Sequence, residues 1–108
     1  MSGYFYLDVS LKLSKDIDTV LPIFIKGSVE DSLRKTFGEI GGLTTLDILK
    51  FDRDSRRGII RVPERDYVKT RAALTLISHF QDIPCHFTVN AASPVLLSLI
   101  GSFIEFDC

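Results

Sequence analysis

The stretch from Leu46 to Val62 constrains the fold more than any other part of the chain. Two alternating apolar runs, 46–51 and 58–62, flank a polar turn that contains Asp-Arg-Asp-Ser. Both runs contain β-branched residues, which suit a half-buried pleated surface. The pattern predicts a β-hairpin. One face of this hairpin must contact a core, so the remaining segments must supply that core.

The same stretch carries most of the positive charge. Eight of the thirteen basic residues fall between positions 50 and 71, namely Lys50, Arg53, Arg56, Arg57, Arg61, Arg65, Lys69 and Arg71. The acids there are Asp52, Asp54, Glu64 and Asp66, so eight minus four leaves four net positive charges. The whole chain has a net charge of −1. That balance argues against free-standing, high-affinity nucleic-acid binding and favours a basic patch within a larger assembly.

Two further segments complete the N-terminal half of the pattern. Gly3 to Leu13 alternates apolar and polar residues, which predicts a strand with one buried face. From Leu21 to Phe37 the apolar residues recur four apart, which predicts a helix. Pro22 suits the first turn of this helix, and Gly38 suits a left-handed stop.

The C-terminal half predicts a second helix, a fourth strand and a short final helix. Asp66 is the expected N-cap of a helix running to about His79, with Val68, Ala72 and Leu76 on its apolar stripe and Leu74 and Ile77 beside it. Cys85, Phe87, Val89 and Ala91 alternate with polar residues in the expected strand. Ser93-Pro94 then fits an N-cap and first helical position before Val95–Ile100. The residues 103–106 are a candidate edge strand.

These elements predict an α+β fold over a single domain, residues 1–108. The order βαββαβ describes a four-stranded antiparallel sheet with two helices on one face, the split βαβ (ferredoxin-like, RRM-like) arrangement, here with an appended C-terminal helix. A length of 108 residues with 45% hydrophobic content fits one core.

Targeting and redox signals point to a soluble intracellular protein. No apolar run reaches the ~18 residues of a membrane-spanning helix, and the N-terminus has no basic flank before a long hydrophobic stretch. The two cysteines, Cys85 and Cys108, form neither a disulfide framework nor a spaced set of metal ligands.

The sequence offers little for catalysis. His79, His86 and Cys85 match no metal, nucleophile or phosphate-loop pattern. We expect no catalytic residues, no metal site and no cofactor, and we assign His79 and His86 to capping or surface roles.

Two other groups of residues are candidates for binding. Arg53, Arg56, Arg57 and Arg61 sit at the hairpin turn and its second arm, where guanidinium groups suit phosphate contact; the same arginines also fit a solvated turn. The segment 93–100 is apolar nearly all round, so Val95, Leu96, Leu99, Ile100 and Phe103 are the candidate protein interface as well as candidate core.

The order and spacing of these segments resemble the small protein subunits of ribonuclease P and ribonuclease MRP, and within them the fourteen-kilodalton branch. The likeness covers roughly residues 33–100. It is carried by Phe37-Gly38-Glu39, Leu46-Asp47-Ile48-Leu49, Gly58-Ile59-Ile60-Arg61-Val62, Ala73-Leu74-Thr75-Leu76, Cys85 with Phe87, and Ser93-Pro94 followed by Leu96-Leu97. The family's fold is similar to the one predicted above.

The resemblance implies a non-catalytic subunit of a nuclear and nucleolar ribonucleoprotein that removes 5′ leaders from precursor tRNA. It further implies three partners: a TIM-barrel subunit, the paralogous small subunit and the ribonuclease P RNA. Membership of ribonuclease MRP stays open. A different class of function, a ferredoxin-like regulatory or dimerisation domain that binds a small metabolite, would draw on Ser28, Thr44 and Thr45. A small enzyme is a third alternative, which would need a convergent His, Cys and acid set.

Overall fold

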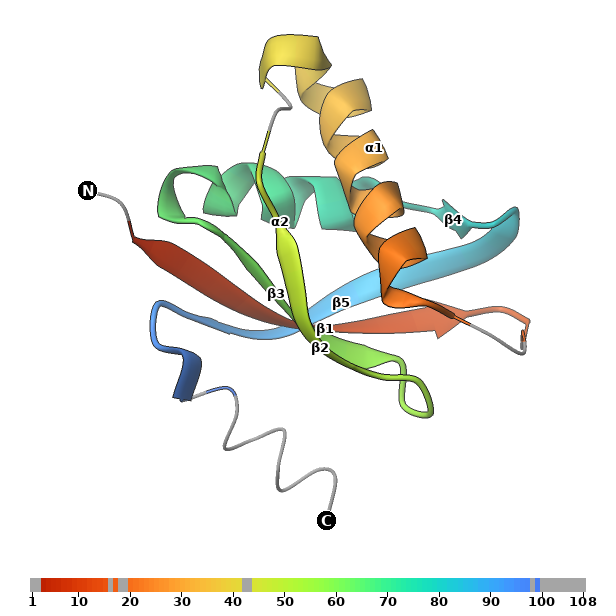
Figure 1. Cartoon of the computed structure of the whole chain (residues 1–108). Helices are drawn as coiled ribbons and strands as arrows, with labels where there is room; N and C mark the ends of the chain where they lie inside the picture. Colours follow the sequence, from red (N-terminus) through yellow and green to blue (C-terminus); the bar gives the residue numbers. More distant parts are fainter. Residues whose placement is uncertain (1–2, 16, 18–19, 42–43, 98, 100–108) are drawn as a thin grey trace.

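A five-stranded antiparallel sheet with two helices on one face forms the body of the protein (Figure 1). The computed structural model describes residues 3–15, 17, 20–41, 44–97 and 99. In chain order the elements are β1 (Tyr4–Leu13), α1 (Pro22–Gly41), β2 (Asp47–Asp52), β3 (Arg57–Pro63), the 3-10 helix η1 (Glu64–Asp66), α2 (Tyr67–Leu76), β4 (His79–Phe80) and β5 (Ile83–Ser93). The strands lie in the order β2-β3-β1-β5-β4.

The predicted α+β class is confirmed, and the number of strands is corrected from four to five. The extra strand is β4, whose two residues pair with Ile83 and Pro84 of β5. Gln81 and Asp82 connect these strands, and both have positive φ, 50° and 65°. A two-residue loop with positive φ at both positions is the geometry of a tight hairpin turn. This turn was not predicted from the sequence, because Gln-Asp lacks the glycine that usually marks such a turn.

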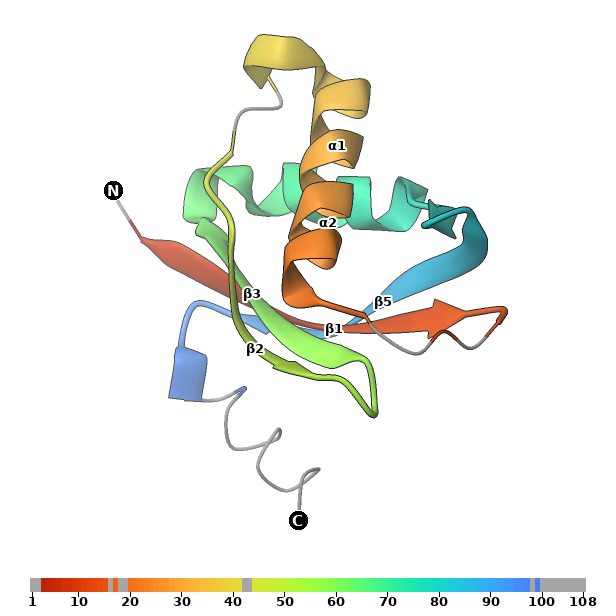
Figure 2. The same cartoon turned by 45° about the vertical axis from the view of Figure 1, so that its right-hand side comes forward.

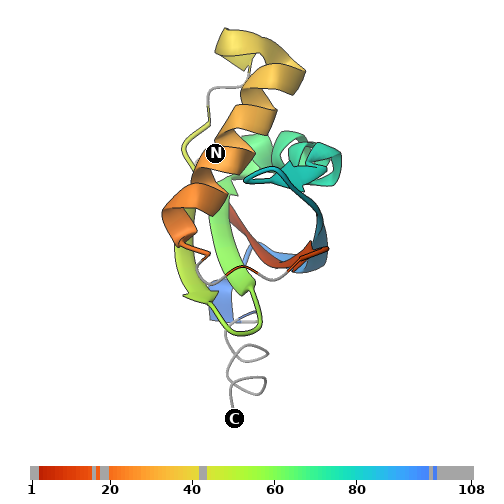
Figure 3. The same ribbon diagram turned by 90° about the vertical axis from the view of Figure 1, so that its right-hand side faces the viewer.

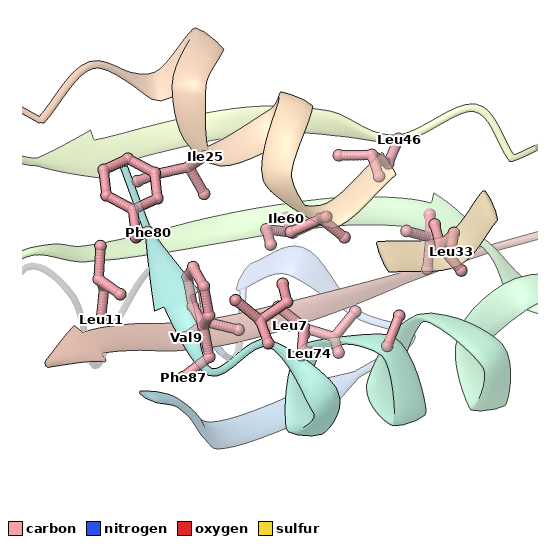
Figure 4. Packing of buried hydrophobic residues seen from close by; sticks show 14 of the residues in the cluster. Leu7, Val9, Leu11, Ile25, Leu33, Leu46, Ile60, Leu74, Phe80 and Phe87 are labelled. Carbon is pink, nitrogen blue, oxygen red and sulfur yellow. The ribbon is translucent and has the colours of Figure 1, made fainter. Parts of the chain in front are cut away.

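The core lies between the sheet and the two helices. Strand β1 is central, pairing with β3 on one side and β5 on the other. Side chains from every layer meet there, namely Leu7, Val9 and Leu11 of β1, Ile60 of β3, Phe87 of β5, Ile25 and Leu33 of α1, and Leu74 of α2 (Figure 4). The alternation predicted for residues 3–13 is therefore confirmed, because the odd-numbered residues of β1 face the helices.

The predicted hairpin is confirmed, with each arm within one residue of its expected limits. Asp52 pairs with Arg57 across the turn, and a register shift between Ile48 and Lys50 makes a bulge in β2. Gly58 is required at the close approach of the two strands. A Cβ atom at this position would lie 2.8 Å from the Lys50 carbonyl oxygen, closer than real contacts allow.

Helix α1 begins at Pro22, as predicted, and presents Ile25, Val29 and Leu33 to the core. Gly38 interrupts it with φ 81° and ψ 175°, a conformation that glycine adopts readily because it has no Cβ. The predicted stop is therefore a break, after which a further helical turn runs to Gly41.

Helix α2 differs from its prediction in three ways. It ends at Leu76 and not near His79, which lies in β4. Its buried face consists of Thr70, Ala73, Leu74 and Ile77, whereas Val68 is 74% exposed and Leu76 is 60% exposed. Leu74 and Ile77 are buried as expected, but the centre of the expected stripe was wrong because the helix instead buries Thr70, a polar residue. Asp66 lies at the N-cap position, but its side chain makes no capping hydrogen bond. Its carboxylate is buried and lies 3.5 Å from Lys69 Nζ.

Strand β5 contains a bulge that changes which side chains face the helices. Val9 pairs with Val89, but Asp8 pairs with Ala91, so Asn90 is the extra residue. Beyond it the alternation reverses, and Ala92 packs against the core where Ala91 was expected. Deviations of this kind commonly place a polar side chain, here Asn90, in a new direction.

Residues 94–97, just after β5, lie on the opposite face of the sheet from α1 and α2 (Figures 2 and 3). Ser93 Oγ accepts a hydrogen bond from the Val95 amide at 3.0 Å, which confirms the predicted cap. Residues 96, 97 and 99 are helical. The expected edge strand at 103–106 lies outside the described residues. None of the described helices has the length and apolar character needed to cross a membrane.

Candidate functional site

The candidate arginines are distributed between the hairpin turn and the face of the sheet that points away from the helices, here called the outer face. Even-numbered residues of β1 lie on this face, together with Arg57, Ile59 and Arg61 of β3. The register places Arg57 beside Ser10 and Arg61 beside Tyr6. Side chains alternate between the two faces along a strand, so Arg57 and Arg61 lie on the outer face while Gly58, Ile60 and Val62 face the core.

Arg57 forms a buried ion pair with Asp8 of β1. Its Nε donates a hydrogen bond of 2.9 Å to Oδ1, and its Nη2 donates to Oδ2. Asp8 is 0% exposed, although it lies on the outer face. Asn90 Nδ2, aimed by the β5 bulge, donates to Asp8 Oδ1 at 3.3 Å and to Ser10 Oγ at 2.7 Å. The network therefore joins β3, β1 and β5 across the sheet.

Arg61 is held by a second carboxylate and by an aromatic ring. Its Nη2 donates to Asp47 Oδ2 at 2.7 Å, and its guanidinium carbon lies 4.8 Å from the centre of the Tyr4 ring. The hydrogen bond with Asp47 raises the pKa of Arg61 above its ordinary value. Contact with a ring face adds a cation–π attraction.

The other two arginines lie at the hairpin turn, where Arg53 is exposed. Arg56 has φ 55°, and its Nη2 donates to the Ile17 carbonyl oxygen at 3.1 Å. The four residues therefore do not form one group. Two are engaged on the outer face, one ties the turn to the segment after β1, and Arg53 projects into solvent.

The candidate protein interface consists of a buried part and an exposed part. Leu99 is 4% exposed and packs with Ile59, Tyr6 and Leu96 in a small cluster on the outer face. Val95 is 53% exposed and Leu97 is 77% exposed. Leu97 was not predicted, because an apolar run does not show which residue faces outward. Ile100 and Phe103 lie outside the described residues.

A groove of about 340 Å³ between α1 and the end of α2 was not predicted from the sequence. Its lining includes Ser28, Ser32, Lys35 and Thr36 of α1 together with His79. Ser32 Oγ donates to the Ala73 carbonyl oxygen at 2.9 Å, which holds the two helices together. Of the three residues proposed for a metabolite, only Ser28 lines this groove.

Comparison with known proteins identifies the family. The model of the Rpp14/Pop5 family matches residues 6–96. The chain belongs to the Rpp14/Pop5 family. Its resemblance to the fourteen-kilodalton branch is confirmed by two similar proteins, each called ribonuclease P protein subunit p14. The Mus musculus protein is 31% identical over 104 residues, covering 96% of this chain and 85% of the relative. The Homo sapiens protein is 29% identical, covering 96% and 84%.

The family fold is also found among solved structures. A chain in the cryo-EM structure of yeast ribonuclease MRP superposes with a TM-score of 0.71 and 15% sequence identity, covering 98% of this chain and 94% of that chain. At that identity the likeness concerns the fold. The family match of residues 6–96 spans all elements from β1 to the start of the segment after β5.

The remaining candidate side chains of this Rpp14/Pop5 family member, Cys85 and His86, lie on opposite faces of β5. His86 is exposed and pairs in register with Lys12, whereas the neighbouring Cys85 packs against the core. Burial raises the pKa of the Cys85 thiol. Within the described ranges, no three His, Cys, Asp or Glu side chains are placed to hold a metal ion together.

Proposed function

We propose that this chain is a non-catalytic protein subunit of ribonuclease P, the ribonucleoprotein that processes the 5′ leaders of precursor tRNA. The observation that carries the proposal is the family match over residues 6–96, together with similarity to two p14 subunits along most of their length. In this role the protein scaffolds the assembly and assists RNA binding, and the chemistry belongs to the RNA.

The expected partners are a TIM-barrel subunit, the paralogous small subunit and the ribonuclease P RNA, in the nucleus and nucleolus. The exposed apolar side chains of Val95 and Leu97 support a protein contact on the segment after β5. When a partner covers these apolar side chains, the complex is stabilised by about 25 cal/mol for each Å² of apolar surface removed from water.

For RNA contact, the structure favours the tip of the hairpin over the outer face. Arg57 and Arg61 already bind the carboxylates of Asp8 and Asp47, which reduces the attraction they offer to a phosphate. Arg53 is exposed at the turn, and Arg56 stands beside it. An exposed guanidinium at a protruding turn reaches phosphate oxygens without breaking a contact of the fold.

Affinity purification of the tagged full-length chain tests the proposed membership. We expect ribonuclease P RNA and protein subunits to be recovered together, with 5′-leader cleavage in the recovered material and none from the purified chain alone. Recovery without that RNA, or metal-dependent cleavage by the chain itself, would contradict the proposal.

The RNA contact is tested in the reconstituted assembly with Arg53→Ala. We expect the fold to be unchanged. The slope of log K against log salt should become shallower by about one, which is the effect of losing one phosphate contact. The matched control is Arg65→Ala, a similarly exposed arginine on η1. Equal slopes in both variants would assign Arg53 to a solvated turn.

A further inference from the structure

Helix α2 has a second apolar stripe, on the side that faces away from the core. Val68, Ala72, Thr75 and Leu76 recur at positions i, i+4, i+7 and i+8, so they lie together along the helix and form what is here called the exposed stripe. Val68 is 74% exposed and Leu76 is 60% exposed. The Thr75 hydroxyl donates to the Arg71 carbonyl oxygen at 2.9 Å, which leaves its methyl group for other contacts. Apolar residues on two sides of a helix are typical of one that is covered on both sides.

Two arginines border the exposed stripe. Arg65 is three residues before Val68 and Arg71 is three residues after it, so they lie on opposite flanks of that side chain. The Arg65 side chain is 80% exposed and lies 3.8 Å from the Asp66 carboxylate. Arg71 is exposed, and its Nη1 donates to the Tyr67 hydroxyl. Residues 64–76 contain three basic and two acidic side chains, and one of the acids, Asp66, is buried. The border of the stripe is therefore positive.

The stripe ends at the groove between α1 and the end of α2. Leu76 belongs to both, because it also lines this groove of about 340 Å³. Lys35 lines the groove from α1, and its Nζ lies 3.0 Å from Asp31 Oδ2, with both side chains more than half exposed. An exposed ion pair of this kind is weak, so Lys35 can turn to a carboxylate that enters the groove. A ligand that covers the stripe therefore meets a third cation at its end.

We propose that the exposed stripe is the docking site for an acidic amphipathic helix of a partner protein. Apolar side chains of the partner, spaced three and four apart, cover Val68, Ala72 and Leu76. Asp or Glu side chains on its flanks pair with Arg65 and Arg71. Val68 and Leu76 are about 12 Å apart along the axis of α2, a length that about two turns of the partner helix cover. A straight helix face receives a second helix by packing ridges into grooves.

The charges beside the stripe decide between this occupant and two others. A second copy of the chain would bring arginines toward arginines, which opposes association. The phosphate backbone of an RNA would satisfy the arginines but would leave Val68 and Leu76 uncovered. The inference rests on helix α2 and goes beyond the proposed ribonuclease P role, which it does not require.

The test is the binding of two labelled model peptides to the full-length chain, measured by fluorescence anisotropy. Each peptide has about 20 residues, enough to form a helix, with Leu at positions i, i+3, i+4 and i+7. One carries Glu on both flanks of the leucines, and the other carries Lys at the same positions. We expect the Glu peptide to bind at least about tenfold more tightly than the Lys peptide.

Three variants locate the binding. Val68→Ser combined with Leu76→Ser should raise the dissociation constant of the Glu peptide at least about tenfold. The matched control is Ile23→Ser on α1, which removes an isoleucine that is 69% exposed and should leave binding unchanged. Arg71→Glu should weaken the Glu peptide and strengthen the Lys peptide. Circular dichroism checks that the variants fold.

The comparison of the two peptides on the unmodified chain decides the question even if a variant fails to fold. Equal binding of both peptides, a dissociation constant above about 1 mM for the Glu peptide, or binding that survives in the folded Val68→Ser, Leu76→Ser variant would each overturn the proposal. Self-association of the chain that this double variant abolishes, measured by sedimentation equilibrium, would identify a second copy as the occupant and would overturn it as well.

Discussion

Replacing Arg57 with alanine should destabilise the protein severely, because it leaves the Asp8 carboxylate buried without its cation. The side chain of Arg57 is 15% exposed and that of Asp8 is 1% exposed, so water does not compensate for the lost partner. The three hydrogen bonds from Arg57 disappear, and among the described residues Asp8 keeps the one from Asn90, which is long at 3.3 Å. We expect a loss of about 3 to 4 kcal/mol in the free energy of unfolding.

Urea unfolding followed by circular dichroism measures this loss, and the dependence of free energy on urea should keep its slope. Arg65→Ala is the matched control, because the Arg65 side chain is 80% exposed and lies 3.8 Å from Asp66. Its effect should stay within about 0.5 kcal/mol. Adding Asp8→Asn to Arg57→Ala removes the unpaired charge and should recover most of the loss. If Arg57→Ala costs no more than Arg65→Ala, the reasoning about burial is wrong.

Three further predictions follow from the packing and the pKa shift. Gly58→Ala brings a methyl group against the Lys50 carbonyl and should cost about 2 kcal/mol by urea unfolding; a neutral result would mean that the hairpin relaxes. Leu99→Ser should lower stability by about 2 kcal/mol, whereas Leu97→Ser should change it by under ~0.5 kcal/mol and weaken capture of protein partners; the reverse order in thermal melts would exchange their roles. In a Cys108→Ser background, Cys85 should react with iodoacetamide more slowly than a small thiol at pH 8, since its raised pKa leaves less thiolate; an equal rate would contradict this.

Local patterns predicted the amphipathic elements whose ends are marked by a turn, a proline or a capping residue. The alternation of β1, the hairpin, the start of α1 at Pro22 and the cap at Ser93 all depend on neighbours within a few positions. Strand β4 was missed because two residues carry no periodicity. The stripe of α2 was misassigned because a buried threonine is invisible to a pattern of apolar residues.

The candidate site was less predictable because its partners are distant in sequence. Arg57 and Asp8 are 49 positions apart, and no local signal shows that an arginine beside a turn is paired across the sheet. From the sequence, Arg57 was grouped with three other arginines that suited either phosphate contact or a solvated turn. The ion pair corrects that expectation for Arg57, whereas exposed Arg53 keeps the properties that were predicted for the whole group.

The extra residue at Asn90 determines on which face of the sheet the residues just after β5 lie. One added residue rotates all later side chains of a strand to the other side, as a slip of register by one position does. Without it, Ser93 and the turn at Pro94 would be directed toward the side that α2 already occupies. Deleting Asn90 should therefore change the route of the C-terminal segment and expose Ile59, although every residue of that segment is retained. The inserted residue therefore decides on which face of the sheet the later residues lie. Alignments of relatives should be checked for it at this position before the residues beyond it are compared.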